Sequence, residues 1–249
     1  YQAYLIAMVA SSAGDIQVAQ DIVKKMDPIR FCSQQVNLAI HARLNIGNRL
    51  IAQQEYNEAI VMLSEAKQMI YGNPVHRFLS SGDSNDSAMI HQNLGYCLMK
   101  VNQLGAAADE YTHALKLNPD LEAAKKHLPL IMAQNTKIDE TIVNLEAALK
   151  KHPDDVKLLN ALAAYCSIRG YYGRAIGYLT KALHVRPDNP EVYYNLACIY
   201  SKQNKLKESG DYLDKAIKLG FHDRDLMKKD PDLYNIRRTR CDIISTKAK

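Results

Sequence analysis

The chain has 249 residues, of which 47% are hydrophobic and none is tryptophan, and its net charge is +5. This apolar content is enough to bury a continuous core, and strand-like alternation is scarce, so the composition predicts an all-α protein. Basic residues gather from Lys218 onwards, where nine Lys and Arg residues stand against five Asp. No basic run with interleaved aromatic residues occurs, so we expect no nucleic-acid binding and interpret the basic end as the solvated face of a capping helix.

Two loosely patterned segments come first in the chain, at residues 1–33 and 40–73. The second carries Gly47 and Ala59 at positions where small residues recur later in the chain. The six residues between the two segments are compatible with a helix, so we expect the first helix of the second segment to begin near Ser33.

An insertion at residues 74–87 follows the second segment. Its end is polar and turn-rich, so we expect a loop in which Asp86 or Ser87 caps the next helix. This loop is either a tolerated surface insertion or a partner-contact or modification site, and the sequence leaves both open.

A unit of 34 residues then recurs in unbroken register from residue 88 to residue 223. Pro119, Pro153 and Pro187 stand 34 positions apart, and Phe221 falls where the next proline would. Small residues recur twelve and five positions before each of these four, a spacing of two turns on one helix face. This period predicts stacked helical hairpins, because one hairpin cannot bury its apolar face alone. The two sets of small positions are Ala107, Thr141, Ala175 and Ser209, and Ala114, Ala148, Ala182 and Ala216.

The unit at residues 122–155 contains the sharpest conflict with a hairpin. Pro129 falls inside its expected first helix, where a proline removes a backbone donor and clashes with the preceding turn at a cost of about 3 kcal/mol. We therefore expect a kink or break near His127–Pro129. The break either widens a binding groove or reflects degeneracy of the repeat, and both interpretations stay open.

The closing segment at residues 224–249 departs from the repeat. Asp230 and Pro231 predict a helix start, with Asp230 as the N-cap and Pro231 at the first helical position. Leu233 and Ile236 follow at helical spacing, so we expect this segment to cover the exposed end of the stack.

These repeats resemble the tetratricopeptide repeat (TPR) family over about nine-tenths of the chain. The best copy carries the family's signature residues Leu94, Gly95, Leu98, Ala107, Tyr111, Ala114 and Pro119. The resemblance implies an all-α, right-handed α-α superhelix (a TPR solenoid) of about six helical hairpins plus a C-terminal capping helix. The expected array spans residues 1–223, as copies 1–33, 40–73, 88–121, 122–155, 156–189 and 190–223 with the insertion 74–87, and the capping segment is 224–249.

The resemblance also implies that the first helix of each repeat lines a concave groove. There, Asn and Gln amides can bind an extended backbone, Tyr and Met supply apolar contact, and Lys can steer an acidic or C-terminal segment. Asn45, Asn93 and Asn195 are either ligand contacts or simply the family's usual residue at their position. The Lys and Asn clamp with which chaperone-binding members hold a terminal carboxylate is not assembled in any repeat. The expected partner-binding groove residues are Tyr4, Met8, His41, Asn45, Asn48, Gln92, Asn93, Tyr96, Lys100, Lys126, Lys157, Asn160, Tyr194, Asn195 and Lys202.

No motif predicts catalysis, a cofactor or a metal site. The eight histidines are scattered, and no H-E-x-x-H, P-loop, G-x-S-x-G or paired-cysteine motif occurs. His91 stands at a core position, so we expect it to be packed rather than to bind a ligand. The five cysteines form no C-x-x-C pair, and Cys97 and Cys166 lie at or beside core positions. We therefore expect buried free thiols and a reducing compartment, the cytoplasm.

The apolar run from Ala3 to Ala10 is too short to span a bilayer, so we expect no membrane span. The chain begins at Tyr1, already inside a repeat, so we expect a fragment of a longer protein that carries its membrane anchor or catalytic domain, if it has one, elsewhere.

Together these patterns predict an interaction module rather than an enzyme, one that binds a peptide or protein partner in its groove and scaffolds a complex. The alternative is the non-catalytic TPR region of a larger enzyme, such as a glycosyltransferase or a membrane-bound transferase. Self-association through the ends of the solenoid is a third hypothesis.

Overall fold

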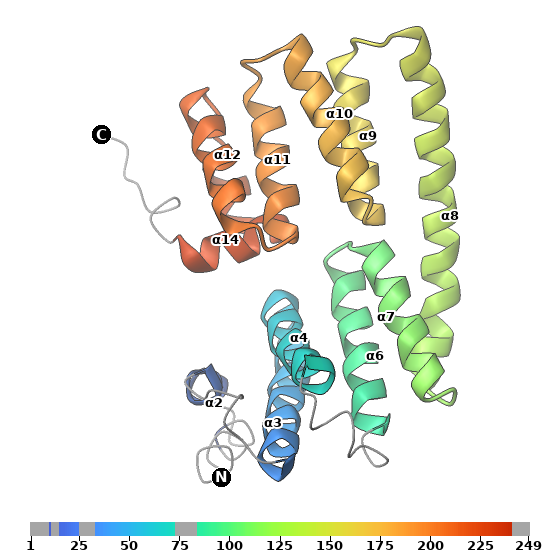
Figure 1. Ribbon diagram of the computed structural model, residues 1–249, viewed down its shortest axis with the longest axis vertical. Helices are drawn as coiled ribbons and strands as arrows, with labels where there is room; N and C mark the ends of the chain where they lie inside the picture. The colour runs from blue at the N-terminus through green and yellow to red at the C-terminus, as the bar shows by residue number, and fades with distance from the viewer. Residues whose placement is uncertain (1–9, 11–14, 25–32, 73–83, 241–249) are drawn as a thin grey trace. The chain divides into compact units, whose positions relative to one another are not determined.

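The computed structural model describes residues 10, 15–24, 33–72 and 84–240, and every regular element in these ranges is helical (Figure 1). The prediction of an all-α fold built from consecutive helix pairs is therefore confirmed. The chain forms two compact units, Tyr1–Gln134 and Asn135–Lys249. Expected features on residues 1–9, 73–83 and 241–249, among them the groove residues Tyr4 and Met8, lie outside the described residues.

Within its described residues, the first unit contains two helical hairpins, and one apolar core cluster extends into the first helix of the second hairpin. The second helix of the first hairpin packs against the first helix of the next, which carries the core from one hairpin to the other. Its helices are α2 (Ile16–Lys24), α3 (Ser33–Ala52) paired with α4 (Tyr56–Gly72), and α6 (Ser84–Lys100) paired with α7 (Leu104–Leu117).

The starts of α3 and α6 test two predictions. α3 begins at Ser33, as predicted. α6 begins at Ser84 and includes Asp86 and Ser87 in its first turns, so neither residue caps the helix and that prediction is wrong.

The second unit contains two further hairpins and the closing segment. Asp155 and Asn189 cap the first helix of each hairpin by accepting backbone N–H groups through their side chains. Its helices are α9 (Val156–Arg169) paired with α10 (Tyr172–Val185), α11 (Pro190–Lys202) paired with α12 (Leu206–Lys218), then α13 (Arg224–Lys229), η2 (Pro231–Leu233) and α14 (Tyr234–Thr239).

Small residues at the predicted positions let paired helices approach closely. A Cβ atom built on Gly47 would lie 2.8 Å from Cγ and Cδ2 of Leu63, and one built on Gly95 would lie 3.0 Å from the ring of Tyr111. Leu63 and Tyr111 are fully buried, so their surroundings prevent them from moving aside. The two glycines therefore set the helix separation in the hairpins of the first unit.

The turn of each described hairpin contains one residue with a positive φ angle. All four occupy the same place in their 34-residue units. Glycine adopts this left-handed conformation freely and asparagine does so at little cost, whereas a β-branched residue is strongly disfavoured there. The four residues are Gln54 (φ 64°), Asn102 (φ 59°), Gly170 (φ 85°) and Asn204 (φ 57°).

The unit at residues 122–155 does not form the expected hairpin. It is almost entirely one helix, α8 (Glu122–Lys151), which continues through Pro129 (Figure 1). Of the predicted kink or break near this proline, the break is therefore wrong, and the kink stays a prediction. Its residue at the turn position is Thr136, whose β-branched side chain disfavours positive φ. No glycine or proline flanks Thr136 closely enough to end the helix, so the helix continues where the other repeats turn.

The C-terminal half of α8 belongs to the second unit and packs on α9 and α10. Ile142 is buried in the apolar cluster that Leu159 and Leu179 also enter. Arg169 pairs with Asp139 at 3.1 Å, so an ion pair as well as apolar packing attaches α8 to the hairpin that follows.

We predict that Gly47→Ala lowers the free energy of unfolding by about 1–2 kcal/mol, because overpacking against Leu63 outweighs the gain in helix propensity. Urea unfolding followed by circular dichroism measures the change. Gly72→Ala is the matched control in the same unit, since its Cβ would meet only the flexible side chain of Gln68, at 3.8 Å. Equal changes in the two variants would contradict this account of helix separation.

We also predict that Asn102→Thr costs about 1–2 kcal/mol of stability, because threonine must adopt the left-handed conformation at the turn. Asn102→Gly should be neutral or slightly stabilising, since glycine adopts a positive φ without strain. Thermal unfolding of the two variants side by side tests this. If the threonine and glycine variants are equally stable, the need for a positive φ angle at the turn does not explain why α8 continues through Thr136.

Candidate functional site

Side chains of α3, α6 and the start of α8 gather on one surface of the first unit. Asn93 Nδ2 donates a hydrogen bond to Asn48 Oδ1 at 2.6 Å, which links α6 to α3. The ring centroid of Tyr96 lies 6.1 Å from that of His127, and Lys100 Nζ lies 5.3 Å from the Tyr96 centroid. We call Asn48, Gln92, Asn93, Tyr96, Lys100 and Lys126 the α3–α6 surface.

This surface is locally cationic. Burial lowers the pKa of His127, and the ammonium groups of Lys126 and Lys100 lower it further. Lys100 and Lys126 are exposed, and neither forms an ion pair with a carboxylate in the described part of the chain. Two cations close to one neutral imidazole make a surface that favours an anionic group.

Two further predicted residues, His41 and Asn45, precede Asn48 on α3. Asn45 is exposed, whereas His41 Nδ1 lies 3.2 Å from Asp86 Oδ2 and is partly occupied by that contact. Gln92 is half-buried, with Nε2 4.0 Å from Met89 Sδ. The structure thus brings most of the predicted residues of the first unit onto one surface.

In the second unit, the closing segment occupies residues that were predicted to bind a partner. Tyr194 Oη donates to Asp230 Oδ2 at 2.6 Å, and Lys202 Nζ lies 3.2 Å from Asp232 Oδ2. The Lys202 side chain is only 3% exposed. Tyr194 and Lys202 therefore hold the protein's own chain, and the prediction that they form an open groove is corrected.

The closing segment is fixed in this place by capping and apolar packing. The Asp230 side chain accepts from Asp232 N and Pro231 occupies the first helical position, both as predicted. Leu233 and Ile236 are buried beside Tyr194. Burial raises the pKa of Asp232 although Lys202 acts in the opposite direction, so its carboxylate is held in a poorly solvated position.

The remaining predicted residues do not join a common site. Lys157 is exposed in the first turn of α9, and Asn195 is half-buried on α11. Asn160 Oδ1 is buried and accepts no hydrogen bond from any described residue.

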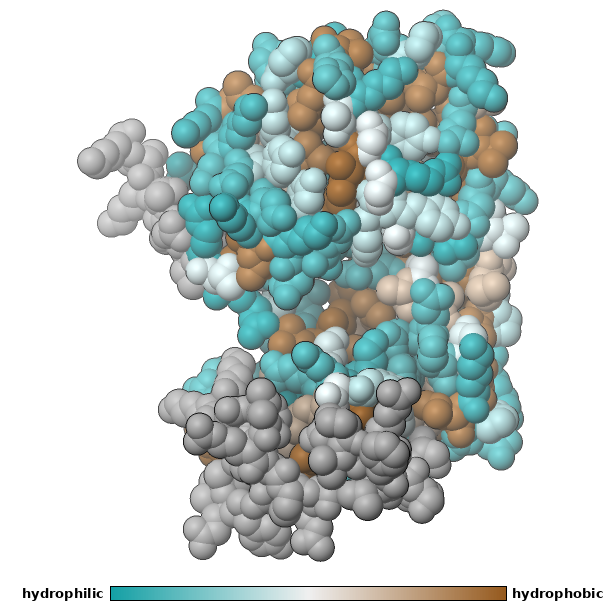
Figure 2. Space-filling model, in the orientation of Figure 1, coloured by the Kyte–Doolittle hydropathy of each residue, from teal (hydrophilic) through white to brown (hydrophobic). Residues whose placement is uncertain are grey.

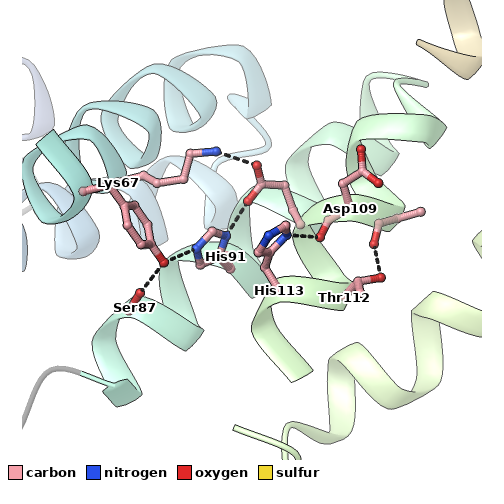
Figure 3. Close-up of polar contacts among 9 residues, drawn as sticks. Lys67, Ser87, His91, Asp109, Thr112 and His113 are labelled. Atoms are coloured by element: carbon pink, nitrogen blue, oxygen red, sulfur yellow. Dashed lines mark hydrogen bonds and ion pairs between the residues drawn. The ribbon is translucent and has the colours of Figure 1, made fainter. Parts of the chain in front are cut away.

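A polar cluster centred on the buried His91, which the sequence did not reveal, joins the two hairpins of the first unit (Figure 3). Glu110 of α7 accepts from Lys67 of α4 at 2.6 Å and contacts His91 Nδ1 of α6, also at 2.6 Å. His91 Nε2 lies 2.8 Å from Tyr71 Oη, which in turn lies 3.2 Å from Ser87 Oγ. We call these five residues the polar cluster.

The protonation of the polar cluster follows from Glu110. Burial alone would raise the pKa of this carboxyl, but hydrogen bonds from His91 and Lys67 lower it overall. An ionised Glu110 can only accept, so His91 carries its proton on Nδ1, and a neutral His91 accepts from Tyr71 through Nε2. Every polar group of the cluster then has a partner, which suits a fixed joint between repeats.

His91 was expected to be packed, and it is buried with 4% of its surface exposed. One sign of the cluster is present in the sequence, a histidine at the repeat position that Leu159 and Tyr193 hold in the last two units. The partners of His91, Tyr71 and Glu110, stand 20 and 19 residues away from it in the chain. They lie on two other helices, so their meeting depends on how the hairpins stack.

Cys97 and Cys166 are buried free thiols, as predicted, and Cys198 is a third. Burial raises the pKa of Cys97 to about 12. Within the described residues, no group of three His, Cys, Asp or Glu side chains is placed to hold a metal ion. None of the described helices is both long and apolar enough to cross a membrane.

Two stretches of the chain match the tetratricopeptide repeat family, residues 90–121 and 178–211. The first coincides with the hairpin of α6 and α7, and the second runs from α10 through α11 into α12. These two stretches of the chain are tetratricopeptide repeats (TPR).

Three relatives are similar to parts of this chain. A chloroplastic protein of Arabidopsis thaliana is 32% identical over 77 residues, which cover 30% of this chain and 23% of that protein. Interferon-induced protein with tetratricopeptide repeats 2 of Mus musculus is 35% identical over 37% of this chain and 20% of its own length. Protein O-mannosyl-transferase Tmtc3 of Drosophila melanogaster is 23% identical over 58% of this chain and 16% of its own length. The chain thus spans less than a quarter of each relative.

Among solved structures, MamA 41-end from Desulfovibrio magneticus RS-1 has 16% identity and a TM-score of 0.33, covering 72% of this chain and 94% of its own. YrrB, described as a TPR protein with an unusual peptide-binding site, has 16% identity and a TM-score of 0.33, covering 72% of this chain and 85% of its own. At this level of similarity neither structure informs function.

We predict that Glu110→Gln lowers the free energy of unfolding at pH 7 by about 2–3 kcal/mol, because it leaves Lys67 and His91 without an ionised acceptor. The folded-state pKa of Glu110 is lowered, so its stabilisation is present above the unfolded pKa of about 4.3 and is lost as pH falls through the folded value. The difference in unfolding free energy between the wild type and the Glu110→Gln variant should therefore become smaller in acid.

Urea unfolding from pH 3 to pH 8 measures this gap. Asp109→Asn is the control, since Asp109 is exposed on the same helix and only its backbone carbonyl enters a hydrogen bond, with His113 (Figure 3). A gap that does not change with pH would show that ionised Glu110 is not what stabilises the cluster.

Proposed function

We propose that this protein binds a peptide or protein partner at the α3–α6 surface and so holds it within a complex. One observation carries the proposal: the first unit presents Tyr96, Asn93 and Lys100 on adjacent turns of α6, and apart from His127 of α8 no segment following the α6–α7 hairpin in the described part of this unit is recorded in contact with Tyr96. On α11, the equivalent helix of the last repeat, the closing segment already fills the corresponding place.

The chemistry of the surface supports a peptide ligand. The side-chain amides of Asn48 and Asn93 already form one hydrogen bond and retain further donor and acceptor capacity for an extended backbone. Tyr96 supplies a rigid aromatic face at low entropic cost, and the packed hairpins hold it in place. The face of the molecule drawn in Figure 2 is mostly hydrophilic, with scattered hydrophobic residues. The α3–α6 surface itself combines amides and lysines with one tyrosine, so a partner of mixed polar and apolar chemistry is the better match.

A second candidate is the TPR region of a larger enzyme. The 23% identity with Tmtc3 over 58% of this chain favours it, because that relative is named an O-mannosyl-transferase. The two functions are compatible, since such a region would bind the substrate protein or a partner subunit. Sequencing the complete open reading frame decides this, and a frame without a transferase domain would contradict it.

The proposal predicts that peptides selected from a random displayed library on the wild-type chain lose at least about tenfold in affinity for the Tyr96→Ala variant, since an aromatic anchor that becomes buried in a complex contributes strongly to binding. Tyr165→Ala is the matched control, because Tyr165 is an exposed tyrosine of α9, away from this surface in the chain.

Circular dichroism confirms that both variants are folded. Fluorescence anisotropy with the selected peptides measures affinity. If the Tyr96→Ala variant binds them as tightly as wild type does, the partner does not use the α3–α6 surface.

A further inference from the structure

The closing segment shows which chemistry the first helix of a repeat can hold. Tyr194, Cys198 and Lys202 stand four residues apart on α11, so they form one stripe along the helix. Tyr194 Oη and Cys198 Sγ both donate to Asp230 Oδ2, at 2.6 Å and 3.6 Å. Lys202 Nζ pairs with Asp232 Oδ2 at 3.2 Å.

The ligand of this stripe is a short acidic segment of the chain. Its two carboxylates, two residues apart, meet three donors on successive turns of one helix. Asn235 Nδ2 adds a hydrogen bond to Ser201 O at 2.9 Å, and Leu233 supplies a buried apolar anchor. The donors hold the acidic side chains, and the apolar residue fixes the segment against the helix.

The repeat register places an equivalent stripe on α6. Lys100 lies three units of 34 residues before Lys202, and Tyr96 lies the same distance before Cys198. Gln92 corresponds to Tyr194. Each of these side chains can donate a hydrogen bond, and Lys100 is the same cation at the same position.

The other two hairpins lack this feature. The position of Lys100 and Lys202 is held by Ala52 on α3 and by Ile168 on α9. Among the four described hairpins, only α6–α7 and α11–α12 therefore have a lysine at this position. In α11–α12 this lysine, Lys202, pairs with Asp232 of the protein's own closing segment.

We propose that the α3–α6 surface binds an extended acidic segment of its partner, with one carboxylate at Lys100 and another near Tyr96 and Gln92, as the closing segment binds α11. This inference rests on the proposed function and names the partner's chemistry. Lys126 adds a second exposed cation beside the first, so the positive charge exceeds that of the α11 stripe. Charge complementarity of this kind also speeds association and makes it dependent on salt.

The direct test uses a synthetic peptide of residues 230–236 with blocked ends, and the same peptide with both aspartates replaced by asparagine. The full chain keeps its own closing segment attached, so the added peptide meets the second unit already occupied. Isothermal titration calorimetry should show the acidic peptide binding at least about fivefold more tightly than the asparagine peptide. This preference should shrink as salt rises.

The site is assigned with two chain variants. Lys100→Gln should remove most of the preference for the acidic peptide, whereas Lys116→Gln, an exposed lysine of α7 in the same hairpin, should leave it unchanged. Lys100 is exposed, so its substitution should leave the fold intact. Loss of the preference only in Lys100→Gln supports the proposal.

Other outcomes separate this inference from the proposed function. If acidic and asparagine peptides bind equally and both lose affinity for Tyr96→Ala, the surface binds peptides but the acidic preference is wrong. If the acidic peptide binds regardless of Lys100 and Tyr96, it binds elsewhere and the inference is overturned. If neither peptide binds while library-selected peptides do, the partner chemistry is wrong and the proposed function stands.

Discussion

The rest of the structure depends on how closely the two helices of a hairpin approach each other. Where Gly47 faces Leu63 and Gly95 faces Tyr111, the first helix presents no side chain and the second fills the space. A pair this close shares one buried face, and the next hairpin can stack on it. The approach also requires a tight turn, and in each described hairpin that turn is closed by a residue with positive φ. Thr136 shows the consequence of losing it, because two helices that should pair become the single helix α8.

Polar groups then fix how one hairpin sits on the next. Apolar faces can shift relative to one another at little cost in free energy. A buried carboxylate that loses its partners, in contrast, destabilises the fold by several kcal/mol. Glu110, held by Lys67 and His91, therefore joins α4 to both helices of the following hairpin in one register. In the second unit, the pair of Arg169 with Asp139 has a comparable role for α8, although it is more exposed and so contributes less.

The same lysine position has different consequences in the two units. Lys202 is almost fully buried and paired with Asp232, so it stabilises the end of the stack. Lys100 is exposed beside Lys126 and an imidazole whose pKa these cations lower. A repeat scaffold can thus use one stripe of side chains either to close itself or to bind another molecule, depending on whether an acidic segment of its own chain reaches the stripe.

The sequence by itself determined the helical class, the succession of paired helices, the buried thiols and the capping role of Asp230. These follow from local spacing and from the 34-residue period, which act between neighbours in the chain. Only the tertiary structure decided that α8 continues through Pro129, that His91 meets Glu110, and that Tyr194 and Lys202 hold the closing segment. Each of these depends on a balance between one local preference and contacts from residues distant in the chain, and periodicity carries no information about that balance.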